Sequence, residues 1–167
     1  MGSILFRVPF DIDFKLSGKG TEKEPYAFKA LNRDNTDFSI TISNSDDYFN
    51  IGKFNLRMIE LIECKNIKIV DSLFKIVKIQ NCKSIQALNL MVSKKFIAQN
   101  SHDFYIYDSK LSNVIVCENS TGLIQNTMIR KISHEDKRKV IIKNPIFTKD
   151  KAPFRHENLF INLLKQL

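Results

Sequence analysis

The sequence predicts an all-β protein, a parallel β-helix of about five or six coils in a single domain. Two observations point to this fold class. A polar pair recurs at a near-constant step, and short apolar alternations stand on each side of it. The chain is also long enough to bury one sizeable core, with 167 residues and 43% hydrophobic content. We expect an N-terminal cap over residues 1–30, coils over 38–147 and a C-terminal helical cap over 153–167.

The recurring polar pair marks a corner of each coil. It reads Asn44-Ser45, Glu63-Cys64, Asn81-Cys82, Asn100-Ser101 and Asn119-Ser120, so the step along the chain is nearly constant. A second polar corner keeps the same steps at Gly52, Asp71, Asn89, Asp108 and Thr127. Stacked strands lie about 4.7–4.9 Å apart, so equivalent residues form ladders. We expect an inward ladder of Asn44, Asn81, Asn100 and Asn119, which Glu63 interrupts.

Apolar residues at alternate positions flank each polar pair, and this period of two predicts strands with one buried face. The pairs before it are Ile40/Ile42, Ile59/Leu61, Val77/Ile79, Phe96/Ala98 and Ile115/Cys117. The pairs after it are Tyr48/Asn50, Ile67/Ile69, Ile85/Ala87, Phe104/Ile106 and Leu123/Gln125. One coil cannot bury its own apolar face, so the coils are expected to stack into a continuous core.

The coil length, the asparagine corner and the stacked Ile, Leu, Val and Phe resemble the parallel β-helix of the pectate-lyase-like superfamily. The stretch SGKGTEKEPYAF, residues 17–28, is similar to the Gly-x-Gly-Thr-x-x-x-Pro-Tyr motif that opens many carbohydrate-binding and sugar-hydrolase β-helix repeats. Those repeats include the copper-accessory periplasmic β-helix proteins. The resemblance covers about residues 17–130 and implies a single-stranded, right-handed coil.

Both ends of the chain carry capping signals. Apolar residues alternate from Ile4 to Leu16, and Pro9 cannot donate a ladder hydrogen bond, which indicates an edge strand or an irregular start. A charged interruption over 133–139 precedes a last apolar segment over 140–147. Phe160, Leu163, Leu164 and Leu167 then fall at helical spacing and predict a helix over the last coil. A free interaction helix and a homo-oligomer through either end stay open.

The best catalytic candidates are Asp71 and Asp108, which the predicted register stacks with Asn89 between them. The resemblance implies enzymes that cut acidic glycans with clustered carboxylates, or with calcium-bound carboxylates and an Arg or Lys base. Two coils separate carboxylates by about 9–10 Å, at the edge of the window of an inverting glycosidase. Asp and Asn are also the usual residues of polar corners, and that interpretation requires no catalysis.

Two outward columns are basic. Arg57, Lys75 and Lys94 form one, and Lys65, Lys83 and His102 form the other. Stacked like charges repel, so these columns favour a surface that meets a polyanion, although an ordinary lysine coat explains them too. Tyr105 and Tyr107 have outward character and could stack a sugar or a base.

Charge and cysteine content bound the partners and the compartment. The net charge of +8 and the pI near 9.4 favour an anionic glycan, nucleic acid or acidic protein. Cys64, Cys82 and Cys117 form no metal-binding pattern, and the scattered His102, His134 and His156 suggest no metal site either. Asp46 and Asp47 are explained as solvated turn residues. We expect no cofactor, no membrane span, reduced thiols and a cytoplasmic location.

The sequence therefore predicts a non-catalytic scaffold or binding module that meets an anionic polymer or a protein through its basic columns. Two alternatives remain open at this stage. One is a small polysaccharide-acting enzyme, a glycoside hydrolase or lyase that uses Asp71 and Asp108. The other is a structural element that assembles end to end.

Overall fold

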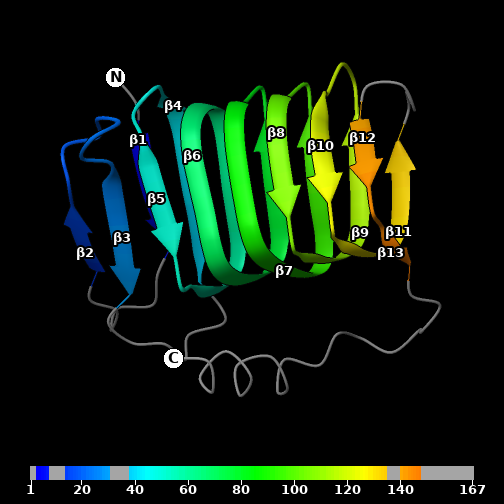
Figure 1. Cartoon of the computed structure of the whole chain (residues 1–167). Coiled ribbons are helices and arrows are strands. Elements are labelled where there is room, and N and C mark those ends of the chain that lie inside the picture. The colour runs from blue at the N-terminus through cyan, green and yellow to red at the C-terminus, as the bar shows by residue number, and fades with distance from the viewer. Residues whose placement is uncertain (1–2, 8–13, 31–37, 135–139, 148–167) are drawn as a thin grey trace.

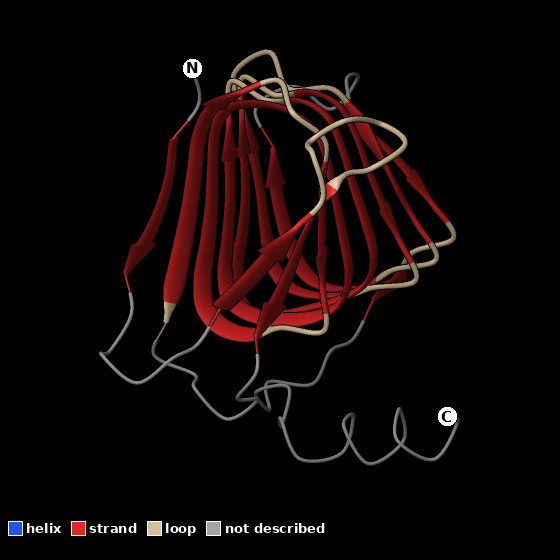
Figure 2. Ribbon diagram, turned by 90° about the vertical axis from the view of Figure 1, so that its left-hand side faces the viewer, coloured by secondary structure: helices blue, strands red, loops and turns tan. Residues whose placement is uncertain are grey.

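A computed structural model of the chain describes residues 3–7, 14–30, 38–134 and 140–147. In this part of the chain, parallel strands stack as a β-solenoid of about six turns, which confirms the predicted fold class. The coils follow one another along a single axis (Figure 1), and the strands wind around a central core (Figure 2). The strands are β1 (Ser3–Arg7), β2 (Phe14–Ser17), β3 (Tyr26–Ala30), β4 (Ser39–Ser45), β5 (Phe49–Gly52), β6 (Asn55–Gln80), β7 (Lys83–Gln99), β8 (His102–Tyr107), β9 (Lys110–Cys117), β10 (Gly122–Gln125), β11 (Met128–His134), β12 (Val140–Lys143) and β13 (Ile146–Phe147).

Each coil pairs in parallel with the coil that follows it. Ile67 of β6 pairs with Ile85 of β7, and Ile85 pairs with Phe104 of β8, so one ladder runs through three coils. The last apolar segment adds a further coil, because β12 pairs with β10 and β13 pairs with β11. Val140–Lys143 and Ile146–Phe147 thus stack on the preceding coil.

The core consists of the inward side chains of these strands. In the middle coils the inward pairs are those that the alternation predicts, and all of them are buried: Ile40/Ile42, Ile59/Leu61, Val77/Ile79, Phe96/Ala98, Ile67/Ile69, Ile85/Ala87 and Phe104/Ile106. Aromatic rings from different sides of a coil meet inside, since the ring centroids of Phe96 and Phe104 lie 6.2 Å apart. Each coil thus completes its core only by contact with its neighbours, as expected of a solenoid.

The predicted inward pair of the fifth coil is wrong by one residue. Val114 and Val116 are the buried residues there, while Ile115 and Cys117 are only partly buried. Phe96 pairs with Val114, whereas the prediction placed Ile115 opposite it, so the strand begins one position early. The corner that follows holds one more residue, which restores the register at Ser120.

The second strands of the end coils are also offset by one residue. Phe49, Ile51 and Ile124 are buried, whereas the predicted pairs Tyr48/Asn50 and Leu123/Gln125 are half-buried or exposed. The cause in the first coil is an additional residue in the turn between Ser45 and Phe49, compared with the turn between Cys64 and Ile67. A slip of one residue turns every side chain of a strand to the other face.

The asparagine ladder is present, but it lies on the outer surface and not inside. Asn81 is exposed, and Asn100 donates a side-chain hydrogen bond of 2.9 Å to its Oδ1 atom. The left-handed corner position has positive φ and is held by Asn44, Glu63, Asn81, Asn100 and Glu118. Asn119 is exposed and lies one residue beyond this position. Asn tolerates the left-handed conformation, which explains its recurrence at this position.

The inward partners of this corner are the small residues of each polar pair. Ser45, Cys64, Cys82, Ser101 and Ser120 are all buried. Their polar atoms bond to the neighbouring coil: the Cys82 N–H donates to Ser101 Oγ at 3.1 Å, and the Ser101 N–H donates to Ser120 Oγ at 3.1 Å. The hydroxyls thus satisfy backbone donors inside the corner, where water has no access.

Asn100 provides a direct test of the corner geometry. Its φ is +44°, so Asn100→Ala should lower the free energy of unfolding by about 1–2 kcal/mol, because a Cβ without a compensating amide strains this conformation. Asn100→Gly should be closer to wild type, because glycine enters this region without strain. Urea denaturation of both variants measures the difference. An alanine variant at least as stable as the glycine variant would rule out the strain.

The N-terminal strands cover the first coil from two sides. β1 pairs antiparallel with β4, and β2 forms an antiparallel hairpin with β3, which in turn pairs in parallel with β5. The hairpin turn contains the predicted opening motif, where Gly18 and Gly20 have φ of +99° and +74°. A Cβ on Gly18 would lie 2.1 Å from the Pro25 carbonyl oxygen, so this turn requires glycine. Pro9 and the predicted helical cap over 153–167 lie outside the described residues.

Candidate functional site

A basic corner forms where the chain turns between two sides of the solenoid. We define it as Arg57, Lys75, Lys94, Lys95 and Lys131. Lys75 lies where the pairing of β6 with β7 shifts register, between the pairs Phe74–Val92 and Ile76–Lys95. The shift gives β7 an additional residue, so Lys94 and Lys95 follow one another at the corner. The structure thus places the predicted column of Arg57, Lys75 and Lys94 beside two lysines that the sequence analysis missed.

Four residues of the basic corner are exposed and have no acidic partner in the described part of the chain. These are Arg57, Lys94, Lys95 and Lys131, and none of them forms an ion pair with another residue of the described ranges. The positive charge of these four residues is therefore not neutralised by an ion pair with a described carboxylate.

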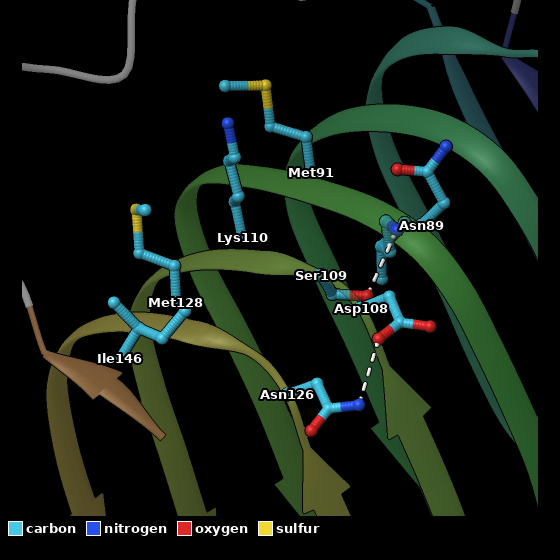
Figure 3. Close-up of a pocket in the computed structure, with 9 residues that line it drawn as sticks. Asn89, Met91, Asp108, Ser109, Lys110, Asn126, Met128 and Ile146 are labelled. Atoms are coloured by element: carbon cyan, nitrogen blue, oxygen red, sulfur yellow. Dashed lines mark hydrogen bonds between the residues drawn. The ribbon is translucent and has the colours of Figure 1, made fainter. Parts of the chain in front are cut away.

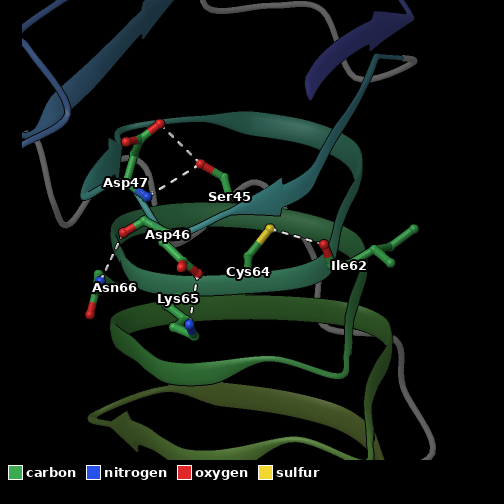
Figure 4. A network of polar contacts seen from close by, with 7 residues as sticks. All are labelled: Ser45, Asp46, Asp47, Ile62, Cys64, Lys65 and Asn66. Atoms are coloured by element: carbon green, nitrogen blue, oxygen red, sulfur yellow. Dashed lines mark hydrogen bonds and ion pairs between the residues drawn. The ribbon is translucent and has the colours of Figure 1, made fainter. Parts of the chain in front are cut away.

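The other basic column has its predicted register but a different electrostatic environment. Lys65 pairs with Lys83, and Lys83 pairs with His102. The Nζ atom of Lys65 lies 2.9 Å from Asp46 Oδ1 (Figure 4), and that of Lys83 lies 3.9 Å from Asp103 Oδ2. Both lysines thus have a carboxylate of the neighbouring corner beside them, and this column presents less net charge than the basic corner.

A hollow of about 190 Å³ lies next to Lys95 and Lys131. Asn113, Val114, Ile115 and Ser133 complete its lining. Asn113 pairs with Lys131 in the sheet, and its Nδ2 atom donates to the Lys94 carbonyl oxygen at 3.1 Å. Two ammonium groups and a serine hydroxyl therefore surround a small depression, a set of donors that suits a carboxylate or a phosphate group.

The aspartate corner is a regular outward ladder. Asp71, Asn89, Asp108, Asn126 and Asn144 all have φ between +47° and +51°. Asn89 Nδ2 donates to Asp71 Oδ1 at 2.9 Å, and Asn126 Nδ2 donates to Asp108 Oδ1 at 3.2 Å. The predicted stacking of Asp71, Asn89 and Asp108 is thus present, with Asn126 in place of Thr127. Both carboxylates accept amide hydrogen bonds at left-handed turn positions.

A second hollow, of about 230 Å³, borders this ladder (Figure 3). Asn89, Asp108 and Asn126 line one side of it, and Met91, Lys110, Met128 and Ile146 rise from the adjoining strands. Asp71 is not among the lining residues. The hollow therefore presents one carboxylate and one ammonium group beside methionine and isoleucine side chains. A pair of catalytic carboxylates would need a second acid that is not among the lining residues.

Neither acidic nor thiol groups gather into a metal site in the described part of the chain, where no cluster of three potential ligands occurs. Asp47 accepts a 3.1 Å hydrogen bond from Ser45 Oγ within its own turn (Figure 4). Cys64 and Cys82 are buried free thiols of adjacent coils. The neighbouring Cys82 thiol, together with burial, raises the pKa of the Cys64 thiol, which favours its protonated form.

Tyr105 and Tyr107 lie on the outer face of β8, as predicted from their alternation with buried residues. Their ring centroids are 6.4 Å apart, and the ring planes are parallel to within 2°. They belong to a different side of the solenoid from the basic corner, and they offer two half-exposed aromatic rings with a common orientation.

Comparison with known proteins identifies no relative. No family model matches the chain, and neither a curated protein nor a solved structure matches it significantly. Among the described residues, no helix is long and apolar enough to cross a membrane.

Proposed function

We propose that the protein is a non-catalytic binding module whose basic corner holds an anionic polymer along the solenoid axis. The observation that carries the proposal is the contrast between the two basic columns. Lys65 and Lys83 have carboxylates beside them, whereas Lys94, Lys95 and Lys131 have none among the described residues. Like charges on adjacent coils repel one another, and a polyanion laid across the coils relieves that repulsion.

The shape of the basic corner supports a polymer as the ligand. Its cations come from several successive coils, which are stacked about 4.8 Å apart, so they form a line and not a single cluster. The hollow between Lys95 and Lys131 supplies a place where one anionic group of the chain would enter. We include in the proposal that the chain is a member of the pectate-lyase-like superfamily, which favours an acidic glycan as the polymer.

The test uses inorganic polyphosphate, an anionic polymer that carries neither a sugar nor a base. The variant K95E/K131E should bind it at least tenfold more weakly than wild type, and the slope of log affinity against log salt should fall by about two, one for each lost contact. Isothermal titration at several salt concentrations measures both quantities.

The matched control is K23E/K53E, which changes the net charge equally at two exposed lysines outside the basic corner. It should keep most of the affinity and the wild-type slope. Equal losses in both variants would mean that net charge, and not the basic corner, determines binding.

A second candidate function is polysaccharide cleavage, which the hollow beside Asp108 favours. Incubation with polygalacturonate separates the two candidates, because a binding module releases no new reducing ends. Cleavage by wild type that is lost in D71N/D108N would replace the binding proposal with a glycan-acting enzyme.

A further inference from the structure

The outer face of the sheet that carries β8 presents two tyrosines together with apolar side chains of the neighbouring coils. It is formed by β5, β8, β10 and β12 and by the parts of β6 and β7 that pair with them, all of which face the viewer in Figure 1. We call this surface the tyrosine face and define it by its outward apolar and aromatic residues, which are Val70, Leu88, Tyr105, Tyr107, Leu123 and Ile141.

The tyrosine face is continuous across the coils. Tyr105 pairs with Leu123 of the next coil, and Tyr107 pairs with Leu88 of the preceding one. Leu88 is 42% exposed and Ile141 is 55% exposed, so this face leaves large apolar side chains in solvent. Exposed apolar surface that is contiguous and centred on aromatic rings is typical of a binding surface.

Two lysines lie on the tyrosine face, each two coils away from a ring. Lys68 pairs with Gln86, which pairs with Tyr105, so a lysine shares the column of this ring two coils away. Lys143 pairs with Gln125, the neighbour of Tyr107 in the other column. Both lysines are exposed and form no ion pair with a described residue.

The carboxylates nearest to the tyrosine face lie at its two edges. Asp103 is at the start of β8 in a left-handed turn position, where it lies beside Lys83. Asp71 and Asp108 belong to the ladder at the opposite corner, where both accept amide hydrogen bonds. Between these edges, the charged groups of the tyrosine face are therefore Lys68 and Lys143, each two coils from a ring, and both are positive.

The two tyrosine rings have the geometry of a stacking platform. Their parallel planes would hold two flat groups in parallel, and their centroid separation of 6.4 Å is nearly twice the spacing of about 3.4 Å between stacked bases. The spacing therefore suits bases that have been drawn apart, as in an extended single strand, more than bases of an intact duplex. Aromatic pairs on an exposed sheet face, with nearby cations for the phosphates, are a common solution for binding single strands.

We propose that the tyrosine face binds single-stranded nucleic acid, with bases stacked on Tyr105 and Tyr107 and phosphates near Lys68 and Lys143. The positive charge favours this ligand over a neutral glycan, and the parallel rings favour flat bases over the puckered rings of an acidic glycan. Gln86 and Gln125 flank the rings and offer amide groups to base edges. The site is separate from the basic corner and does not depend on its function.

The experiment compares two fluorescein-labelled 12-mers, oligodeoxythymidine and an abasic strand with the same phosphates, by fluorescence anisotropy. Wild type should bind the thymidine strand at least fivefold more tightly, since each stacked base adds about fivefold to a hundredfold in affinity. Y105A/Y107A should bind both strands alike, at the abasic level. Y105F/Y107F keeps the rings and should retain the preference, and thermal unfolding checks that both variants are folded.

The comparison of the two strands with wild type needs no variant, so it tests the proposal even if the alanine variant fails to fold. Equal binding of both strands by wild type would overturn it. So would a preference that persists in Y105A/Y107A. Binding of cellohexaose by wild type that disappears in Y105A/Y107A would assign the face to a sugar and would overturn the proposal as well.

Discussion

Removal of one whole coil, residues 60–77, should leave a folded protein, whereas removal of residues 60–76 should not. The longer deletion joins Ile59 to Lys78, which takes the position of Glu60, its partner across adjacent coils in a 2.8 Å ion pair. The alternation of buried and exposed residues therefore continues without a break. Because each coil contacts only its neighbours, a solenoid tolerates the loss of one repeat at a cost in stability.

The shorter deletion leaves one additional residue and places Ile59 directly before Val77, two side chains that both point inward. Every later side chain of that strand then turns to the wrong face. Circular dichroism during heating should show one cooperative transition for the longer deletion, below the wild-type midpoint, and none for the shorter deletion. Similar unfolding of both variants would contradict the equivalence of the coils.

Gly122→Ala should lower the free energy of unfolding by about 3 kcal/mol, a large effect for a single methyl group. A Cβ at Gly122 would lie 2.5 Å from the Phe104 carbonyl oxygen and 2.5 Å from its ring. The backbone oxygen cannot move without breaking the pairing of β8 with β10. The large ring of one coil thus requires the absence of a side chain in the next.

Gly52→Ala is the matched control, because the nearest atom to its added Cβ is Val70 Cγ2 at 3.0 Å, a side-chain methyl group. Its cost should stay below about 1 kcal/mol, as the valine shifts slightly. Guanidinium denaturation of the two variants measures the difference. An equal loss of stability in the two variants would show that the backbone adjusts to remove the clash with Phe104, and would contradict the prediction.

The middle of the fold could be predicted from the sequence because its period is regular there. Ile59, Val77 and Phe96 recur at a near-constant step with polar corners at fixed offsets, and all three are buried as expected. The end coils differ by single residues inserted or omitted in turns. The period of the repeat does not reveal which turn has gained or lost a residue. The sequence analysis therefore predicted the wrong set of alternate residues as buried in the strand that buries Val114 and Val116.

The asparagine ladder was predicted to point inward, but it points outward. The backbone preference of Asn for the left-handed conformation would have predicted the outward direction. Each corner offers a polar pair, of which one residue takes the left-handed conformation and points outward. Asn adopts that conformation far more readily than Ser or Cys. Asn81 and Asn100 therefore belong outside, and Cys82 and Ser101 inside, as the structure shows.

The candidate site was predicted in part for similar reasons. Lys94 was expected, but Lys95 and Lys131 depend on the register shift after Val92, which has no signature in the period. The carboxylates beside Lys65 and Lys83 could not be foreseen, since Asp46 lies in a turn and Asp103 adopts a left-handed conformation at the start of β8, which the period of the repeat does not show. A repeat sequence thus predicts which basic residues stack in a column, but it does not predict which of them have a carboxylate nearby.

The central claim, that the basic corner binds a polyanion, is tested most directly by backbone amide chemical shifts of the ¹⁵N-labelled protein during titration with inorganic polyphosphate. The predicted result is a set of shifts centred on Lys94, Lys95 and Lys131, which weakens as salt is added. Shifts centred on Lys65 and Lys83, or spread evenly over the lysines of the molecule, would contradict the claim.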